Sequence, residues 1–440
     1  MTVASTTENM SPGLREVAER AKQEPEGRFH SLAHLIDVSA LERAHQRMRK
    51  DAAVGVDGVT KDQYGQELSK NLADLHERLK TKRYRHQPIR RVHIPKPNGK
   101  TRPIGVSTVE DKLVQDVVRE VLGAIYEQDF LDCSYGFRPG RSAHDAIRAM
   151  GRSVKQGRAR WIIEADIVGF FDNVDRTALL EMIALRVADG SLLRLVGKCL
   201  HVGVLDGEEL SRPEEGTAQG SVLSPLLGNI YLHHVLDLWF EREVSPRLIG
   251  EASLVRYADD FVLTFERRDD AERVWRVIGK RMQRFGLTLH PDKSRLFSFD
   301  RPSRGQGGKG PTTFDFLGFT HYWRRSRRGN WMWACKTRRE GLRRALQAVA
   351  DWCRRHRHWS WTEQHAALSR RVRGHVNYFG VNGNGESLER FIQRLNRIWY
   401  AWLRRRSQRS SMRWDRFNAL LKACPLPAPL IKVQIWEPRP

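Results

Sequence analysis

Two adjacent carboxylates interrupt the most strongly β-forming stretch of the chain. Residues 254–265 read LVRYADDFVLTF, with β-branched and aromatic side chains on both sides of an Ala-Asp pair. This pattern predicts a tight hairpin in which one strand ends at Tyr257 and the next begins at Asp260. Asp259 and Asp260 would repel each other there unless a divalent cation lay between them, and Mg²⁺ prefers such hard oxygen ligands. On this stretch alone, a solvated Asp-Asp turn is the more common outcome.

The length and composition limit the class of protein. A chain of 440 residues is too long for one compact core, so we expect two or three domains. Residues 1–28 are polar without a clear period, which predicts a flexible leader. There is no apolar run of bilayer length and no signal-peptide core at the N-terminus, so we expect a cytoplasmic protein with no membrane partner. The five cysteines are scattered without a CxxC pair, which indicates neither a zinc ribbon nor a disulfide framework.

The net charge is strongly positive and unevenly distributed. The chain carries 76 Lys and Arg against 52 Asp and Glu, a net charge of +24. Residues 331–440 hold 23 of these basic residues, 7 of the acidic ones and 9 of the 13 tryptophans. Guanidinium groups interleaved with large aromatics suit contacts with phosphates, sugars and bases. We therefore expect a polyanionic partner, with a merely soluble basic helical domain as the alternative.

A second acidic candidate follows another β-rich run. Residues 161–167 favour a strand that delivers Asp166 at its end and then turns through Gly169 into aromatic residues. A metal site on a sheet would need such a carboxylate, although a surface Asp that ends a strand is equally compatible.

Two further segments carry groups suited to phosphates. Residues 89–106 predict a hairpin around a Pro-Asn-Gly turn, and its basic side chains could reach a triphosphate. An exposed hairpin with charges for solubility is the alternative. Residues 135–146 form a Gly/Pro loop with two arginines that enters a helix near Ser142, which favours a phosphate, although a capped loop-to-helix junction explains it equally well.

The remaining segments complete the predicted order. A core helix begins near Glu110, and Gln219 lies between small residues that let the backbone approach a ligand. Lys293 follows an amphipathic helix, and residues 314–320 predict one strand with a glycine where another group approaches the backbone. The C-terminal part is helical, with one apolar stripe made of Leu388, Phe391, Ile392, Leu395, Ile398, Trp399, Trp402 and Leu403. Arg390, Arg394, Arg397, Arg404 and Arg405 lie mostly off that stripe and form the candidate nucleic-acid surface.

The order of these segments resembles blocks one to seven of a reverse transcriptase, and the chain is most similar to the group II intron reverse transcriptase/maturase family of the bacterial type. The resemblance covers residues from about 50 to 330, and the segment from about 335 resembles the thumb or maturase domain of that family. Cys424 stands alone there, so we expect no C-terminal HNH endonuclease domain. The implied fold is α+β: a right-hand polymerase with fingers and palm at 29–330, an antiparallel sheet that carries the catalytic hairpin, and a basic α-helical thumb/maturase (domain X) at 331–440.

The resemblance also implies roles for individual residues. The catalytic carboxylates would be Asp166, Asp259 and Asp260, of which Asp260 is a supporting charge. Two Mg²⁺ ions, for which Mn²⁺ can substitute, would be bound by Asp166, Asp259 and the backbone carbonyl of Ile167. The residues implied to contact the nucleotide are Lys96, Arg102, Gln219 and Phe171, whose bulk would exclude a 2′-hydroxyl. The residues implied to contact template or primer are Arg138, Lys293 and the primer grip Phe316, Leu317 and Gly318.

The implied function is RNA-directed DNA polymerisation by two-metal phosphoryl transfer, together with splicing and mobility of a group II intron. Its partners would be intron and template RNA, DNA primer and target, and deoxynucleoside triphosphates. One alternative is a free-standing enzyme domesticated for DNA repair or phage defence, and another is an RNA-binding maturase with an idle polymerase. A viral RNA-dependent RNA polymerase is disfavoured by Tyr257-Ala258 and by Phe171.

Overall fold

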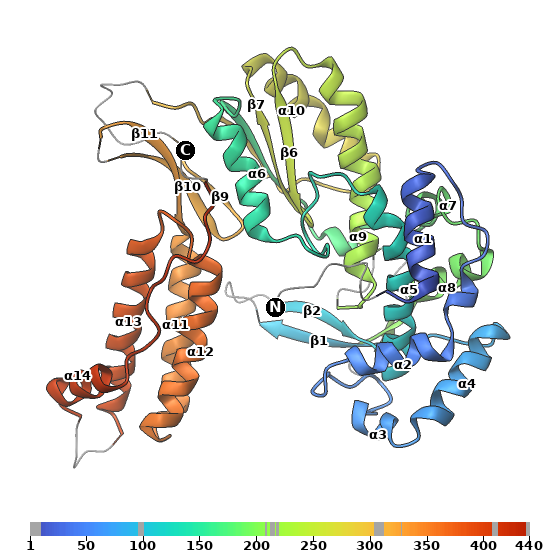
Figure 1. Ribbon diagram of the computed structural model, residues 1–440, viewed down its shortest axis with the longest axis horizontal. Helices are drawn as coiled ribbons and strands as arrows, with labels where there is room; N and C mark the ends of the chain where they lie inside the picture. Colours follow the sequence, from blue (N-terminus) through green and yellow to red (C-terminus); the bar gives the residue numbers. More distant parts are fainter. Residues whose placement is uncertain are drawn as a thin grey trace. The chain divides into compact units, whose positions relative to one another are not determined.

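The computed structural model describes residues 10–95, 101–206, 209–211, 216, 220–302, 312–326, 328–406 and 412–436 (Figure 1). These residues form two compact units, each assembled from separate parts of the chain. The first unit comprises residues 1–142, 163–263 and 269–296, and the second comprises 143–162, 264–268 and 297–440. Residues 297–330 therefore cluster with the C-terminal helices and not with the segment 29–330 in which the sequence analysis placed them.

Most helices of the first unit come from the N-terminal half of the chain. The helical elements that lie wholly or mainly in this unit are α1 (Pro12–Gln23), η1 (Ala33–Leu35), α2 (Val38–Arg47), α3 (Lys61–Gly65), α4 (Leu68–Lys80), α5 (Val109–Asp129), η2 (Phe170–Asp172), α7 (Arg176–Ala184), α8 (Gly190–Leu200), α9 (Ser224–Leu232), the π-helical η3 (His233–Asp237) and η4 (Phe240–Val244), η5 (Ser245–Arg247) and α10 (Arg268–Gln283).

The helix predicted from about Glu110 is α5, and it forms the core of this unit. The Thr108 side chain caps its N-terminus by accepting the Asp111 N–H, at 3.2 Å. The apolar residues of α5 are buried, and α1 packs against it. The predicted flexible leader is therefore wrong for residues 12–23, which form α1. Its buried face consists of Leu14, Ala18 and Ala21, and two alanines give too weak an apolar signal to reveal the helical period.

A four-stranded sheet in the order β2-β1-β4-β5 contains the predicted basic hairpin. Its strands are β1 (Ile89–Pro95), β2 (Thr101–Val106), β4 (Val204–Asp206) and β5 (Glu209–Ser211). Strands β1 and β2 are antiparallel, with Arg90 opposite Val106 and Pro95 opposite Thr101. The predicted pairing of these two strands is confirmed, while the turn at 96–100 lies outside the described residues.

The second four-stranded sheet has the order β6-β7-β3-β8. Its strands are β6 (Ala252–Tyr257), β7 (Asp260–Phe265), β3 (Trp161–Asp166) and β8 (Arg295–Ser298). Strands β6 and β7 are neighbours joined by the two-residue turn Ala258-Asp259, with the ends that the sequence predicted. Residues 261–265 of β7 are all buried, the continuous burial that is typical of a strand covered on both faces.

The second unit combines one β-meander with helices. Its elements are α6 (Ala143–Lys155), β9 (Phe314–Phe316), β10 (Phe319–Arg325), β11 (Trp331–Thr337), α11 (Arg339–Arg355), α12 (Trp361–Phe379), α13 (Gly385–Leu403) and α14 (Trp414–Ala423). The single strand predicted at 314–320 is wrong, because β9 and β10 pair antiparallel across a tight turn. Leu317 and Gly318 adopt φ angles of 50° and 77°, and two positive φ values define a turn of the type I′ class.

Helices α11, α12, α13 and α14 of the second unit share one apolar core. Trp361 on α12 stacks on Trp399 on α13, with ring centroids 4.3 Å apart, and Trp399 Nε1 donates a hydrogen bond to Gln364 Oε1 at 2.7 Å. The apolar stripe predicted for α13 is confirmed, because Leu388, Phe391, Leu395, Trp399 and Leu403 are buried. Within the residues that the structure describes, no helix has both the length and the apolar character required to cross a bilayer.

Candidate active site

The two predicted acidic segments meet at one edge of the sheet β6-β7-β3-β8. The N–H of Arg160, just before β3, donates to the carbonyl of Phe265, the last residue of β7, at 2.9 Å. Because β3 therefore begins beside the end of β7, these neighbouring strands run antiparallel. The far end of β3, at Asp166, consequently lies at the same edge as the β6–β7 turn with Asp259. Asp166, Asp259 and Asp260 are all half-buried.

Asp166 is held in place by the segment that precedes β8. The Asp166 carbonyl accepts a hydrogen bond from the His290 N–H at 2.8 Å, and the Val168 N–H donates to the Thr288 carbonyl at 2.9 Å. Between them, the buried Ile167 forms an isolated antiparallel bridge with Leu289. These contacts pair residues 166–168 with residues 288–290, so a neighbouring segment holds the end of β3 that carries Asp166.

The Lys293 ammonium contacts the Asp166 carboxylate directly. The Lys293 side chain is 60% exposed and the Asp166 side chain 28% exposed, so solvent reaches the pair. Exposed ion pairs of this kind contribute little to stability, and the contact can exchange with other cations. Sequence resemblance assigned Lys293 to template or primer, whereas the structure brings it to the predicted metal ligand.

The position occupied by the Lys293 ammonium tests whether a cation fits this site. It shows that the Asp166 carboxylate points to a place where positive charge is accommodated. Among the described residues, no group of three His, Cys, Asp or Glu side chains is close enough to hold a metal ion. Mg²⁺ is commonly bound by only one or two carboxylates, with water and substrate phosphates as its other ligands. The oxygen donors of Asp166 and Asp259 fit that kind of site.

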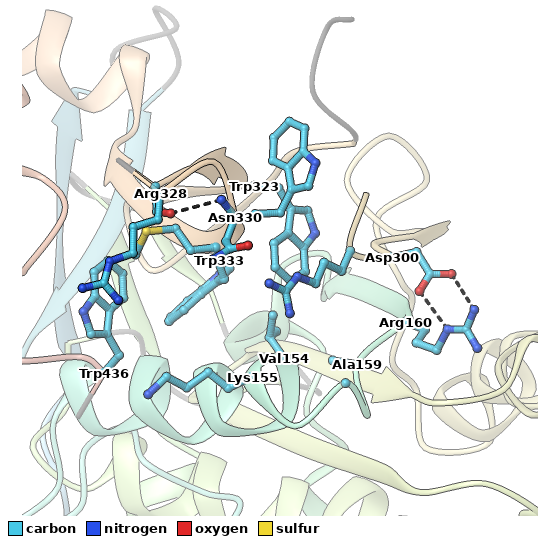
Figure 2. A pocket seen from close by; sticks show the side chains of 15 residues that line it. Val154, Lys155, Ala159, Arg160, Asp300, Trp323, Arg328, Asn330, Trp333 and Trp436 are labelled. Atoms are coloured by element: carbon cyan, nitrogen blue, oxygen red, sulfur yellow. Dashed lines mark hydrogen bonds and ion pairs between the residues drawn. The ribbon is translucent and has the colours of Figure 1, made fainter. Parts of the chain in front are cut away.

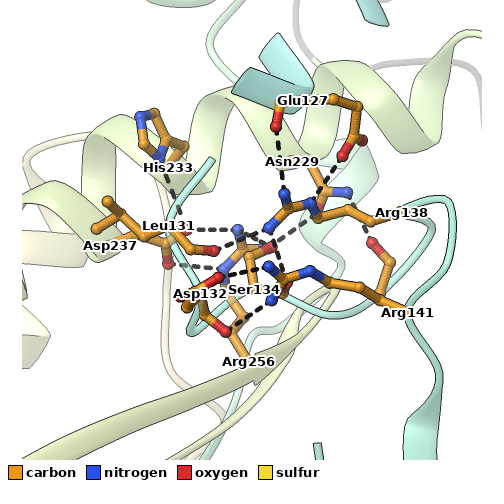
Figure 3. A network of polar contacts seen from close by, with 11 residues as sticks. Glu127, Leu131, Asp132, Ser134, Arg138, Arg141, Asn229, His233, Asp237 and Arg256 are labelled. Atoms are coloured by element: carbon orange, nitrogen blue, oxygen red, sulfur yellow. Dashed lines mark hydrogen bonds and ion pairs between the residues drawn. The ribbon is translucent and has the colours of Figure 1, made fainter. Parts of the chain in front are cut away.

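A buried polar network lies beneath the turn (Figure 3). Arg256, on β6, is fully buried and binds the Asp237 carboxylate through Nε at 2.8 Å and Nη2 at 2.6 Å. Its Nη1 donates to Asn229 Oδ1 at 2.9 Å and to the carbonyl of Ala258 at 3.1 Å, and Nη2 also donates to Ser134 Oγ at 2.8 Å. Burial by itself would lower the pKa of Arg256, but the charge of Asp237 raises the pKa above its ordinary value. Arg256 therefore stays charged.

The Gly/Arg loop of residues 135–141 packs against the same turn. A Cβ added at Gly136 would lie 2.4 Å from the backbone nitrogen of Ala258, so only glycine fits there. Asn229 Nδ2 donates to the Gly136 carbonyl at 2.7 Å, which ties the loop to α9. Ala258 itself has a φ of +58°, an unusual value for a non-glycine residue. The turn is thus held from two sides, by Arg256 and by the loop.

Arg138, which we expected at the template, is an internal residue in this structure (Figure 3). Its Nε donates to Glu127 Oε2 at 3.0 Å, and its Nη1 donates to the carbonyls of Leu131 at 2.8 Å and Ser134 at 3.0 Å. Burial lowers the pKa of Arg138 despite the charge of Glu127. The template contact at Arg138 stays a prediction, and it would require these internal hydrogen bonds to open.

Phe137, the residue before Arg138, is exposed. Its side chain is 59% exposed, its φ is +59° and its ring centroid lies 6.5 Å from that of Tyr257. The sequence analysis did not name Phe137 among the residues that could contact the template or primer. The available signal was an aromatic residue between a glycine and an arginine in a loop that is otherwise polar.

Phe171 lies in the short helix η2, directly after the Asp166 strand. Its ring is 5.0 Å from that of Phe170, and both rings pack on α9 at Gly228, where an added Cβ would lie 3.2 Å from Phe171 Cε1. Gly169, with a φ of +53°, provides the turn into η2 that the sequence predicted. The aromatic ring is therefore fixed near the end of β3, while its contact with a nucleotide sugar stays a prediction.

Several predicted residues are not tested by the described part of the chain. Lys96 and Gln219 lie outside the described residues, as does the side chain of Arg102, whose backbone pairs with Ile94. Phe316, Leu317 and Gly318 form the β9–β10 turn of the second unit, where Tyr378 Oη donates to the Leu317 carbonyl at 2.9 Å.

The sequence analysis also did not name Arg256 and Asp237 as residues that support the site. The available signal was an Asp within an apolar helical run.

The family described as "Reverse transcriptase (RNA-dependent DNA polymerase)" matches residues 94–321. The group II intron-encoded protein LtrA of Lactococcus lactis subsp. cremoris is 38% identical over 215 residues, which cover 47% of this chain and 36% of LtrA. Protein YkfC of Escherichia coli (strain K12) is 34% identical over 283 residues, which cover 57% of this chain and 74% of YkfC.

A eukaryotic relative shows the same kind of partial coverage. The putative COX1/OXI3 intron 1 protein of Saccharomyces cerevisiae is 25% identical over 313 residues, which cover 60% of this chain and 37% of that protein. The chain thus spans about a third of the length of these two intron proteins, LtrA and the yeast protein.

Proposed function

The chain belongs to the reverse transcriptase family, and we propose that it synthesises DNA on an RNA template at the edge of the sheet β6-β7-β3-β8. One observation carries the assignment of the site to this edge: Asp166 and the Ala258-Asp259 turn, 92 or more residues apart in sequence, end at the same edge because β3 and β7 run antiparallel. The substrates would be an RNA template, a DNA primer and deoxynucleoside triphosphates.

The proposed roles follow the chemistry of the side chains. Asp166, Asp259 and the Ile167 carbonyl would hold two Mg²⁺ ions, which when bound would stabilise the charge on the attacking 3′-oxygen and the leaving pyrophosphate. Asp260 would add supporting negative charge. Lys293 would neutralise Asp166 while the site is without metal, which reduces the repulsion between the carboxylates.

The resemblance to reverse transcriptases implies which residues bind the nucleotide. Lys96 and Arg102 would contact its triphosphate, Gln219 would lie beside it, and Phe171 would exclude a 2′-hydroxyl. The packing of Phe171 against Phe170 and Gly228 supports a steric role, because a ring held by its neighbours discriminates by shape. Arg138 and the segment Phe316-Leu317-Gly318 would contact template and primer.

Primer extension tests this proposal. We expect the wild-type chain to extend a DNA primer on an RNA template in Mg²⁺ or Mn²⁺, and to stop when the metal is chelated. Asp259→Ala is expected to lose at least about 100-fold in rate, because it removes a charge that acts at the reacting phosphate. The matched control is Asp51→Ala, which removes an exposed carboxylate paired only locally with Arg49. Extension by Asp259→Ala at the control rate would refute the metal assignment.

A second activity, assistance to splicing and mobility of a group II intron, is supported by the basic helices of the second unit. Arg390, Arg394, Arg397, Arg404 and Arg405 are all exposed on or just after α13, opposite its buried stripe. Such a surface suits the shape and phosphates of an RNA duplex. LtrA, a relative of this chain, is itself described as group II intron-encoded. Splicing by Asp259→Ala protein at the wild-type rate would separate this role from polymerisation.

A further inference from the structure

The second unit contains a cavity of about 680 Å³ (Figure 2). Its walls come from the end of α6, the β10–β11 hairpin, residues 300–301 and Trp436 near the C-terminus. This volume is within the range of pockets that bind small organic ligands. All the residues that line it belong to the second unit, so it contains neither Asp166 nor Asp259.

Tryptophans form much of the cavity wall. Trp323 and Trp333 are buried, and Trp331 and Trp436 are half-buried. The rings of Trp333 and Trp436 meet edge to face, with centroids 6.0 Å apart. Aromatic side chains of this kind provide surfaces for nucleobases, and such stacking is tolerant of base identity.

Trp333 carries an unsatisfied polar group. Trp333 is only 4% exposed, and its Nε1 has no hydrogen-bond acceptor among the described residues. By contrast, Trp323 Nε1 donates to the Phe299 carbonyl at 3.1 Å. The six-membered ring of Trp333 is pressed against α6, since a Cβ at Gly151 would lie 2.6 Å from its Cζ3. The N–H edge therefore faces away from α6 and is itself buried, so the rings of the tryptophans, and not this N–H, form the surface that the cavity presents.

The charge of the cavity is positive. Among the described residues that line it, Lys155, Arg160, Arg301 and Arg328 are basic and Asp300 is acidic. Asp300 is bound by Arg160 through two hydrogen bonds of 2.7 and 3.0 Å (Figure 2). With Arg160 neutralised in this way, Arg301 and Arg328 give the exposed margin an excess of positive charge, which favours an anionic ligand. A purely apolar ligand would not match it.

We propose that this cavity binds one nucleotide, with its base against the tryptophans and its phosphate at the basic margin. A nucleotide combines the two features that the cavity favours: a planar aromatic face for the tryptophans and negative charge for the basic margin. It could be one residue of single-stranded RNA or a free mononucleotide, because both present the same base and phosphate. This site is additional to the proposed polymerase site and does not depend on that proposal.

Binding experiments with adenosine 5′-monophosphate and with a short RNA distinguish a free mononucleotide from a residue of single-stranded RNA as the ligand. The full chain would be titrated calorimetrically with the mononucleotide and with adenosine, in chelator so that no metal-dependent site contributes. A fluorescent single strand of about six nucleotides would be titrated by anisotropy at about 0.3 M salt, where non-specific phosphate contacts are weak. Binding of both ligands indicates a site open to free nucleotides, and binding of the RNA alone indicates an RNA residue.

Variants of Trp331 and Arg328 locate the binding. Trp331→Ala should weaken binding roughly 5- to 150-fold, the equivalent of about 1–3 kcal/mol per stacked base, while Trp331→Phe retains most of it. Arg328→Gln should weaken the mononucleotide but not adenosine. The matched control is Trp359→Ala, which removes an exposed tryptophan of the same unit outside the cavity.

The proposal is overturned if neither nucleotide nor RNA binds, or if Trp331→Ala and Arg328→Gln both bind like the wild type. Primer extension measured on the same preparations separates the two proposals. If a cavity variant loses nucleotide binding but extends a primer normally, the result supports the cavity proposal independently of the polymerase assignment. If the wild type binds the nucleotide but does not extend a primer, the result contradicts only the polymerase assignment.

Discussion

At the scale of single residues, Arg256 determines where the acidic turn lies. A guanidinium has five N–H donors, and the five hydrogen bonds of Arg256 use all of them. Their acceptors come from the loop at Ser134, from α9, from η3 and from the turn itself (Figure 3). No donor is left to solvent, so the network either forms completely or leaves buried charge unpaired.

We predict that Arg256→Gln strongly destabilises the protein. It leaves the fully buried Asp237 carboxylate without its counter-charge, and breaking a buried pair in this way costs about 3–5 kcal/mol. The measurement is the free energy of unfolding of the full chain, obtained by urea denaturation. Arg276→Gln, which removes an exposed arginine on α10, should change it by less than about 0.5 kcal/mol.

The double variant Arg256→Leu with Asp237→Leu provides a second test of this pair. Removing both charges together leaves no unpaired ion, so it should recover a large part of the stability lost in the single variant. Equal destabilisation by the single and the double variants would show that the charge pairing is not the cause.

At the scale of elements, the loop at Gly136 and the β6–β7 hairpin behave as one assembly. The closeness of Gly136 to Ala258 depends on the absence of a side chain, and the turn has a backbone conformation that alanine rarely adopts. A small displacement of the loop must therefore move the turn, and with it Asp259. The loop at Gly136 is therefore coupled to the Ala258-Asp259 turn by backbone packing rather than by side-chain chemistry.

We predict that Gly136→Ala reduces primer extension at least about tenfold, because a shift of about 1 Å at a catalytic group has effects of this size or larger. The control is Gly123→Ala on α5, where an added Cβ meets nothing within 4 Å. That variant should preserve activity and raise the free energy of unfolding by about 0.5–1 kcal/mol. Normal extension by Gly136→Ala would show that the turn tolerates displacement.

At the scale of the whole molecule, the two compact units do not follow the order of the sequence. Helix α6 belongs to the second unit because Gly151 lets Trp333 of β11 pack against it. Residues 297–330 join the same unit because β10 pairs with β11 over seven residue pairs, from Phe319–Thr337 to Arg325–Trp331. The excess charge of the C-terminal 110 residues, 23 basic against 7 acidic, is therefore presented by a unit that also contains parts of the central chain.

The salt dependence of RNA binding tests this basic surface. For each phosphate contact that is lost, the slope of log K against log salt falls by about 0.7–0.9. Replacing Arg390, Arg394 and Arg397 together by Gln should therefore reduce the slope by about two to three. Gln393→Ala, an exposed and uncharged neighbour on α13, is the control and should leave the slope unchanged. An unchanged slope in the triple variant would exclude this face as the RNA surface.

The sequence by itself determined the features that depend on local residue type. The β-branched runs around Ala258-Asp259 set the hairpin and its ends, and the apolar period of residues 388–403 set the buried face of α13. The order of the motifs indicated the family. Local patterns carry this information because the apolar periods of strands and helices are visible within a short stretch of neighbouring residues.

Tertiary structure alone decided what depends on residues far apart in the chain. It brought Lys293 to Asp166, buried Arg138 while exposing Phe137, and completed the hydrogen bonds of Arg256 with residues up to 122 positions away. It also set the β9–β10 turn at Leu317, where a non-glycine residue with positive φ is stabilised by Tyr378. Such arrangements come from long-range packing and hydrogen bonding, which local propensity does not encode.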